Sequence, residues 1–335
     1  MWKRLAPAAG LFFLAPLVGE FLLGNLPITM LPALVALAPM YGGAALLIRE
    51  IVRRRGLGRP AVLLLGLAFA VIQEAFVTRS LFDPDYAGLR LLDYGYVPGL
   101  GIGAWWTVLV LVLHAVWSIA VPVALAESLT VSRRETPWLG RPGLVVTTVL
   151  FVAGLALSAS TVEAPPALSP VQIGVAASAV LLAIGVALRR PARDLGHARD
   201  RRSGAAAPSP WAVGLVGLLS GSAFWLGGLF VDADLAVPAP ALVAAYLALV
   251  AAVAAGVAHW SRREGWGEPH RLALAGGALL TYAWHGFVQP PAVEASAAVD
   301  LAGDVVFALA AVVLLSVAAT RVRRISVQAL RIDVP

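Results

Sequence analysis

The sequence predicts an all-α fold: a polytopic integral membrane bundle of about ten transmembrane helices with both termini in the cytoplasm. Composition is the first observation behind this prediction. Of the 335 residues, 60% are hydrophobic and only 13% are charged, whereas soluble domains average roughly 45–50% apolar and about 25% charged residues. This balance excludes a soluble enzyme, a nucleic-acid-binding module and a disordered chain. The apolar stretches and the placement of the arginines are the other two observations.

Ten apolar stretches are long enough to cross a bilayer, which takes about 20 mostly apolar residues in a helix. In chain order they lie near residues 5–23, 26–48, 61–79, 100–126, 143–161, 170–188, 211–231, 238–260, 272–289 and 300–320. Each stretch is predicted to form one membrane-spanning helix.

The basic residues alternate between the gaps that separate these stretches. All 25 except Arg79 and Arg90 lie in or beside every second gap or near the chain termini, and acidic residues such as Asp85 and Glu163 occupy the opposite gaps. Because cytoplasmic loops carry the excess of Lys and Arg, both termini are predicted to be cytoplasmic. A count wrong by one helix would destroy the alternation, so the alternation independently supports ten spans.

One long polar loop, residues 189–210, is rich in Arg, Ala and Pro. It is predicted to separate an N-terminal six-helix region, residues 1–188, from a C-terminal four-helix region, residues 211–335. The N-terminal region carries the candidate polar site. The chain has no cysteine, which excludes disulfides, thiolate catalysis and cysteine-ligated metal centres.

Four ionisable residues lie inside the predicted helices, away from their cytoplasmic ends: Glu20, Glu74, His114 and His285. A charged side chain is expensive in hydrocarbon, so each of the four is a candidate functional residue.

Other ionisable residues lie at the cytoplasmic ends of the helices. Glu50 and Glu127 have arginines nearby and are expected to form ion pairs with them. His259 and His270 are expected to be solvated.

Polar residues follow helical spacing around three of the candidates. The pairs on one helix face are Glu74 with Thr78, His114 with Ser118, and Thr281 with His285. Two interpretations are open. The groups hydrogen-bond one another and hold the bundle together, or they line a water-accessible cavity that opens toward the outer side.

A carboxylate and an imidazole in such a cavity can activate water. Burial makes a carboxylate more basic, which suits Glu74 as a general base, and a histidine opposite it could donate to an oxyanion. Zinc is a rival use of the same residues, but the chain has no HExxH motif. No metal or other cofactor is therefore predicted.

Residues 73–82 resemble motif 1 of the CAAX-protease and bacteriocin-processing (CPBP) family of intramembrane proteases. That motif reads EExxxR and is usually followed by a small residue and an apolar pair. Gln73 and Glu74 fall on its two glutamates, Thr78 falls on its arginine, and Arg79 comes one place later.

The helix that follows resembles the HxxxN helix of the same family, with His114 at the histidine and Ser118 at the asparagine. The resemblance covers about residues 60–126, and the family's FxxxH motif is not found there. It implies a glutamate that activates water, polar groups that stabilise the oxyanion, and cleavage of a peptide bond within the membrane.

This resemblance makes Glu74 the base and His114 the oxyanion or proton partner. The supporting polar residues are Gln73, Thr78, Ser118, Glu20 and His285. The expected partners are the lipid bilayer and a membrane-embedded peptide or protein, in a bacterial inner (cytoplasmic) membrane, and nucleic acid is not expected.

The departures from the motifs leave other functions open. The chain is an active endopeptidase or a relative without proteolytic activity. A second possibility is a transporter or permease component in which Glu20, Glu74 and His114 relay protons or bind a polar substrate. A third is a non-catalytic membrane scaffold.

Two geometric expectations can be checked in a structure. Glu74 and His114 are expected to face each other, although they lie about 8 Å and 21 Å from the outer ends of their predicted helices at 1.5 Å per residue. In the outer loop, Asp83 or Asp85 is expected to pair with Arg79 or Arg90.

Overall fold

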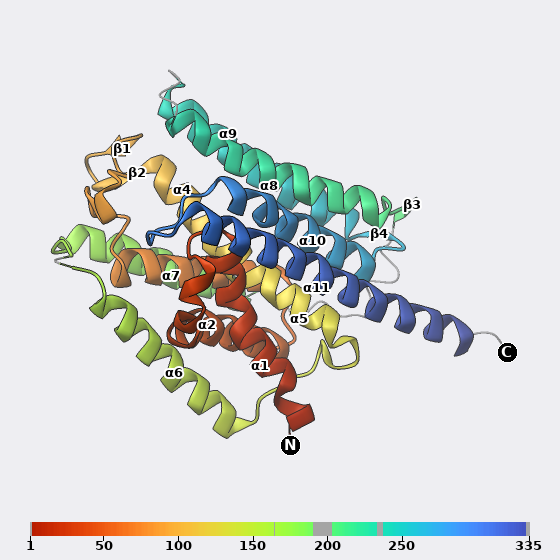
Figure 1. The fold of residues 1–335 in the computed structure, drawn as a ribbon. Helices are drawn as coiled ribbons and strands as arrows, with labels where there is room; N and C mark the ends of the chain where they lie inside the picture. Colours follow the sequence, from red (N-terminus) through yellow and green to blue (C-terminus); the bar gives the residue numbers. More distant parts are fainter. Residues whose placement is uncertain (1, 164, 190–202, 233–236, 333–335) are drawn as a thin grey trace.

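The computed structural model describes residues 2–163, 165–189, 203–232 and 237–332. These residues form a helical bundle, which confirms the predicted all-α membrane fold (Figure 1). The α-helices are α1 (Trp2–Pro16), α2 (Leu34–Arg54), α3 (Pro60–Val71), α4 (Ala104–Leu113), α5 (Val121–Leu129), α6 (Arg141–Ser160), α7 (Pro170–Arg189), α8 (Pro210–Asp232), α9 (Ala239–Trp260), α10 (Glu268–His285) and α11 (Ala297–Ile332).

Short elements complete the fold. Three are π-helices: η1 (Leu17–Leu22), η3 (Ile72–Val77) and η5 (His114–Ala120). Four are 3₁₀-helices: η2 (Ile28–Ala33), η4 (Tyr86–Gly88), η6 (Val131–Arg133) and η7 (Gly286–Val288). Strands β1 (Tyr96–Val97) and β2 (Ile102–Gly103) pair antiparallel, and β3 (Ser203–Ala206) pairs parallel with β4 (Arg263–Glu264).

Nine helical segments within the described residues are long and apolar enough to cross a membrane, and α4, η5 and α5 together form one of them. The predicted stretch 272–289 corresponds instead to α10, which is helical but less apolar. Its first turn carries Glu268, His270 and Arg271, and it ends on His285. Interior packing explains why it tolerates these residues, because α10 packs against α5, α8 and α11.

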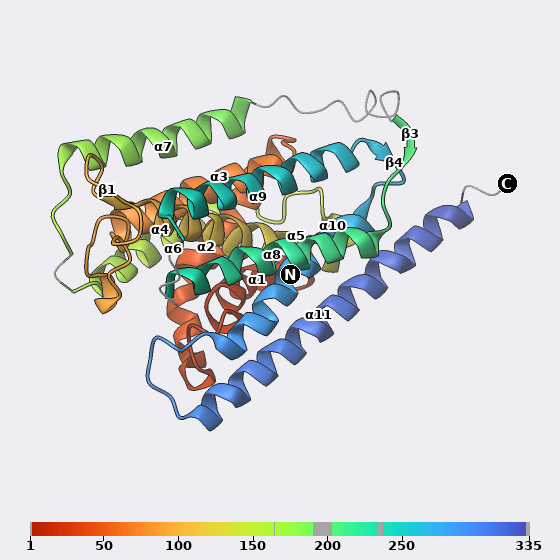
Figure 2. The same cartoon turned by 90° about the horizontal axis from the view of Figure 1, so that it is seen from above.

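The bundle has buried central helices and peripheral helices. In the hydropathic core of α3 and of the α4–α5 segment, 67% of the residues are buried, against 11–17% in α6, α7, α9 and α11. Figure 1 shows α6 and α9 on opposite sides of the bundle, and Figure 2 shows the same for α7 and α11. The peripheral helices therefore expose apolar side chains where lipid surrounds the protein.

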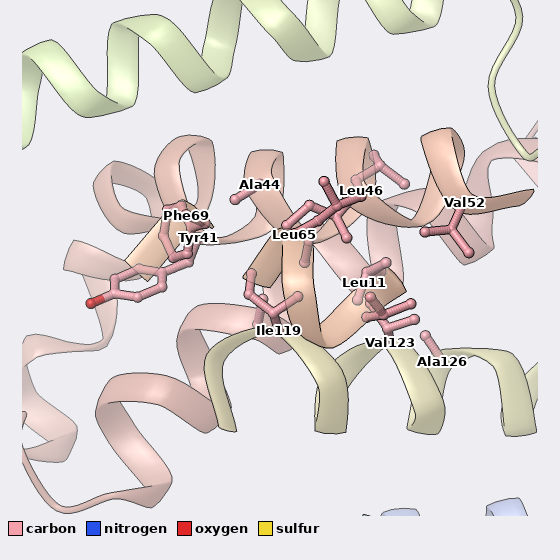
Figure 3. Packing of buried hydrophobic residues seen from close by; sticks show 14 of the residues in the cluster. Leu11, Tyr41, Ala44, Leu46, Val52, Leu65, Phe69, Ile119, Val123 and Ala126 are labelled. Carbon is pink, nitrogen blue, oxygen red and sulfur yellow. The ribbon is translucent and has the colours of Figure 1, made fainter. Parts of the chain in front are cut away.

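One apolar cluster joins α1, α2, α3 and α5 with the inner faces of α6 and α7. Figure 3 shows Tyr41 beside Phe69 at one end of this cluster, with Val52 and Ala126 toward the other. A second cluster joins η1, α4 and η5 to α8, α10 and α11, where Trp117 and Tyr282 stack in parallel. The helices on either side of the loop 189–210 thus share a core, and the predicted two-region division stays a prediction. Residues 190–202 of that loop lie outside the described residues.

The predicted ion pairs of Glu50 and Glu127 are confirmed. Arg53 binds Glu127 through two hydrogen bonds of 2.7 and 2.5 Å, and Arg49 lies 3.1 Å from both Glu50 and Glu127. The Arg49 guanidinium also stacks on the ring of Trp138. These contacts hold α5 and the α5–α6 loop against α2. They lie at the end of the bundle that the arginines predict to be cytoplasmic.

The expectation for His270 is wrong, while His259 is exposed as expected. His270 is buried because it closes the first turn of α10. Its Nδ1 accepts the Gly267 amide at 3.2 Å, and its ring stacks on Trp266.

Candidate functional site

Three helices become π-helical at the positions that carry the candidate residues. Glu20 lies in η1 after α1, Glu74 in η3 after α3, and His114 begins η5 after α4. The segment η5 packs against both η1 and α3. π-helical turns are rare and occur frequently at functional sites, so their convergence marks this part of the bundle.

Glu74 and His114 contact each other directly, as expected. Glu74 Oε1 lies 2.8 Å from His114 Nε2, and both side chains are buried, with about 6% exposed. The other ring nitrogen, Nδ1, lies 3.1 Å from Ser118 Oγ one turn later in the chain. A carboxylate, an imidazole and a hydroxyl therefore form one hydrogen-bonded chain.

The second carboxylate oxygen of Glu74 accepts hydrogen bonds from two hydroxyls. Thr78 Oγ1 lies 3.1 Å from Oε2, and Ser80 Oγ donates to the same oxygen. Ser80 is fully buried and in turn accepts the indole N–H of Trp106 at 3.2 Å. Sequence reasoning missed Ser80. The only sequence indication was its place as the small residue that usually follows the motif containing Glu74.

The Trp106 contact explains why Glu74 and His114 lie at the same depth, although they are expected at different distances from the outer ends of their helices. Trp106 lies level with Ser80, which follows the end of η3, so α4 begins farther out than α3 and η3 end. His114 is thereby brought to the depth of Glu74 without an intervening group.

Tyr41 packs on the face of the His114 ring. The two rings stack with centroids 5.8 Å apart and an interplanar angle of 27°, and Phe69 meets His114 edge-on at 6.0 Å. Tyr41 donates to Glu20 Oε1 at 2.5 Å, and Asn25 donates to Glu20 Oε2 at 2.5 Å. Sequence reasoning missed Tyr41 and Asn25, because neither follows the spacing of a polar helix face.

The outer loop adds Tyr86 to this region. Burial, followed by the negative charges of Glu74, Glu20 and Asp83, raises the pKa of Tyr86 to about 12. The Tyr86 hydroxyl is therefore within electrostatic range of both carboxylates.

Comparison with known proteins identifies the family. Residues 11–330 match a family described as an uncharacterized membrane protein family. The chain belongs to that family. No curated protein and no solved structure matches it, and the match shows no link to the CPBP proteases.

In this member of the uncharacterized membrane protein family, Gln73 is buried beside Glu74, but its side-chain oxygen has no partner among the described residues. Its backbone oxygen accepts the Thr78 amide at 2.9 Å and so closes the π-turn of η3. His285 does not join Glu74 and His114. It packs on Trp225 with ring centroids 4.2 Å apart.

The predicted pairing in the outer loop is wrong in its partners. Arg79 has a positive φ of 61° and donates to the Pro166 carbonyl at 2.7 Å. Arg90 pairs with Asp93 at 2.7 Å, three residues later. Asp83 accepts the backbone N–H of Asp85 instead of an arginine. Local backbone geometry therefore overrode the expected pairing.

No group of three or more His, Asp or Glu side chains that could hold a metal occurs among the described residues. A hollow of about 340 Å³ in the outer loop is lined by Phe82, Asp93, Tyr96 and Gln172 among others. Glu74 and His114 do not line it.

Proposed function

We propose that this integral membrane protein is a glutamate-dependent hydrolase that cleaves a peptide bond of a membrane-embedded peptide or protein. Glu74 is the general base, and His114 donates to the oxygen that becomes negatively charged. The observation that carries the proposal is the buried 2.8 Å contact between Glu74 Oε1 and His114 Nε2. The motif resemblance of residues 73–82 supports the same roles, and the bacterial cytoplasmic membrane is the proposed location.

The surrounding hydrogen bonds give the two carboxylate oxygens of Glu74 different roles. Thr78 and Ser80 hold Oε2, so Oε1 is the oxygen that takes a proton. A water entering between Oε1 and Nε2 would give its proton to Glu74, and its oxygen would attack the carbonyl carbon. The His114 N–H would stabilise the resulting oxyanion, and the proton on Glu74 would pass to the leaving nitrogen.

Ser118 and Tyr41 are positioning residues in this mechanism. Ser118 Oγ binds Nδ1 of His114 and thereby fixes which ring nitrogen faces Glu74. Tyr41 stacks on the imidazole and limits its rotation.

A proton-coupled transporter is the second candidate, because the half-buried Glu20 and the buried Glu74 lie on either side of one tyrosine–histidine pair. Glu20 binds Tyr41, and Tyr41 stacks on the His114 that binds Glu74. Discontinuous helices beside ionisable groups are typical of transporters, and three helices here contain π-turns.

One set of variants separates these functions. The purified protein in liposomes is incubated with a pool of synthetic 20-residue apolar peptides, and products are measured by mass spectrometry. For a hydrolase, Glu74→Gln and His114→Gln should each lower the cleavage rate by about 10²–10⁴-fold, whereas the exposed-carboxylate control Glu163→Gln should not.

The same liposomes report proton flux after an imposed pH step. Flux that is lost in both Glu20→Gln and Glu74→Gln, without peptide cleavage in the wild type, would favour the transporter. Absence of both cleavage and proton flux in the wild type would leave only the scaffold function.

A further inference from the structure

Three buried polar atoms gather on α8 and α10, away from Glu74 and His114. They are Trp225 Nε1, the Tyr282 hydroxyl and His285 Nδ1, and none has a hydrogen-bond partner among the described residues. Tyr282 is 0% exposed and His285 is 8% exposed. Buried polar atoms are nearly always hydrogen-bonded to protein or to ordered water, so three in one place indicate a bound molecule.

The three residues contact one another. The Trp225 ring lies 4.2 Å from His285 and 5.6 Å from Tyr282, measured between centroids. His285 and Tyr282 are three residues apart on α10, near its outer end. The three side chains that carry the unpartnered atoms therefore form one constellation at the α8–α10 interface.

This constellation adjoins Glu20. The turn after η1 meets the end of α10 so closely that a Cβ added to Gly24 would lie 2.9 Å from the Gly286 backbone. Tyr282 lies within electrostatic range of Glu20, and it stacks on Trp117 of η5 at 5.1 Å. Glu20 in turn binds Tyr41, which stacks on His114.

The chemistry of the unpartnered atoms selects the ligand. An indole N–H only donates, whereas a phenol and a neutral imidazole both donate and accept. An anion would be repelled by Glu20, and closely stacked rings leave no space for a large organic molecule. A small neutral molecule that donates and accepts satisfies all three atoms, and water fits this description.

We propose that Trp225, Tyr282 and His285 form a water-binding site that connects the outer side of the membrane with Glu20. Resting on the proposed hydrolase function, the site supplies the water that Glu74 activates. Water enters beside His285, passes Tyr282 and reaches the Glu20–Tyr41 pair next to His114.

Cysteine substitution tests the site directly, because the chain has no native cysteine. His285→Cys and Tyr282→Cys are made in the full chain, with Leu279→Cys as the matched control. Leu279 is also fully buried on α10, three residues before Tyr282, but its side chain carries no polar atom. Ethylammonium methanethiosulfonate is added from the outer side of sealed vesicles. We expect positions 282 and 285 to react at least ten times faster than position 279.

Reaction at 282 and 285 no faster than at 279, or only from the cytoplasmic side, would overturn the proposal. Tyr282→Phe is a second test that keeps the ring and removes only the hydroxyl. A hydrated hydroxyl predicts a lower Tm for this variant, and a higher Tm would mean that the hydroxyl has no partner at all.

The two proposals can fail separately. Fast thiol modification together with unchanged peptide cleavage in Glu74→Gln would keep the water site and refute the hydrolase. Loss of cleavage in Glu74→Gln with slow modification would keep the hydrolase and refute this route for water.

Discussion

Glu74 and His114 are 40 residues apart in the chain, yet Oε1 of one lies 2.8 Å from Nε2 of the other. Both side chains begin from π-helical segments, η3 and η5. The contact therefore joins two helices at the positions where their regular hydrogen bonding is interrupted, and it pairs two groups that are costly to bury alone in a membrane.

A double-mutant cycle should measure this contact. Glu74→Gln and His114→Gln should each lower the free energy of unfolding in detergent. The double variant should lose less than the sum, with a coupling energy of about 1–3 kcal/mol, because a buried charge-assisted hydrogen bond is lost only once. Combining Glu74→Gln with Ser316→Ala, which is exposed on α11, should be additive. Additivity in the first cycle would mean that the two residues do not interact.

Gly19 should be sensitive to the smallest enlargement. A Cβ at this position of η1 would lie 3.2 Å from Ser118 Oγ, so Gly19→Ala should push that hydroxyl away from His114. We expect Gly19→Ala to lower the Tm of the wild type. In the Ser118→Ala background, where the hydroxyl is absent, the same change should lower the Tm by less. Thermal unfolding of the single and double variants checks this. An equal effect of Gly19→Ala in both backgrounds would contradict it.

The end of the bundle that is predicted to be cytoplasmic should show an acid-dependent stability through Glu268. Burial alone would raise the pKa of Glu268, but Arg59, Arg271 and Arg134 lower it below the ordinary value of 4.5. Arg59 lies 3.0 Å from its carboxylate. A lowered pKa in the folded state means that the ionised form stabilises the protein above pH 4.5, and that this stabilisation is lost as pH falls through the lowered pKa.

Glu268→Gln should therefore lower the unfolding free energy at pH 7 by about 1 kcal/mol. It should also reduce the decline in Tm between pH 5 and the acid range. Glu264→Gln is the matched control, since Glu264 is exposed. Identical acid profiles for the wild type and Glu268→Gln would show that the arginines do not act on this carboxylate.

Cysteine labelling should establish the orientation of the bundle. Asp85→Cys and Glu163→Cys lie in exposed predicted outer loops, whereas Arg55→Cys and Arg262→Cys lie in exposed predicted cytoplasmic loops. An impermeant maleimide should label the first pair in intact cells and the second pair only after permeabilisation. The reverse pattern would invert the topology and place both termini outside.

The sequence was sufficient for the membrane class because bilayer thickness constrains helix length and composition at every span. It was also sufficient to single out Glu74 and His114, because ionisable groups within apolar helices are conspicuous. The pairing of Arg79 and Arg90 was not predictable in the same way. It depended on a positive φ at Arg79 and on a local partner for Arg90, and neither feature follows from charge alone.

What the sequence determined by itself was the set of helices and the few polar residues they carry, since both depend on local composition. The tertiary structure alone decided which polar groups meet. It brought Ser80 and Thr78 to Glu74, set Tyr41 against His114, and placed His285 against Trp225. These contacts depend on the relative depth and rotation of packed helices, which π-turns change by fractions of a turn and which the spacing of residues along one helix does not record.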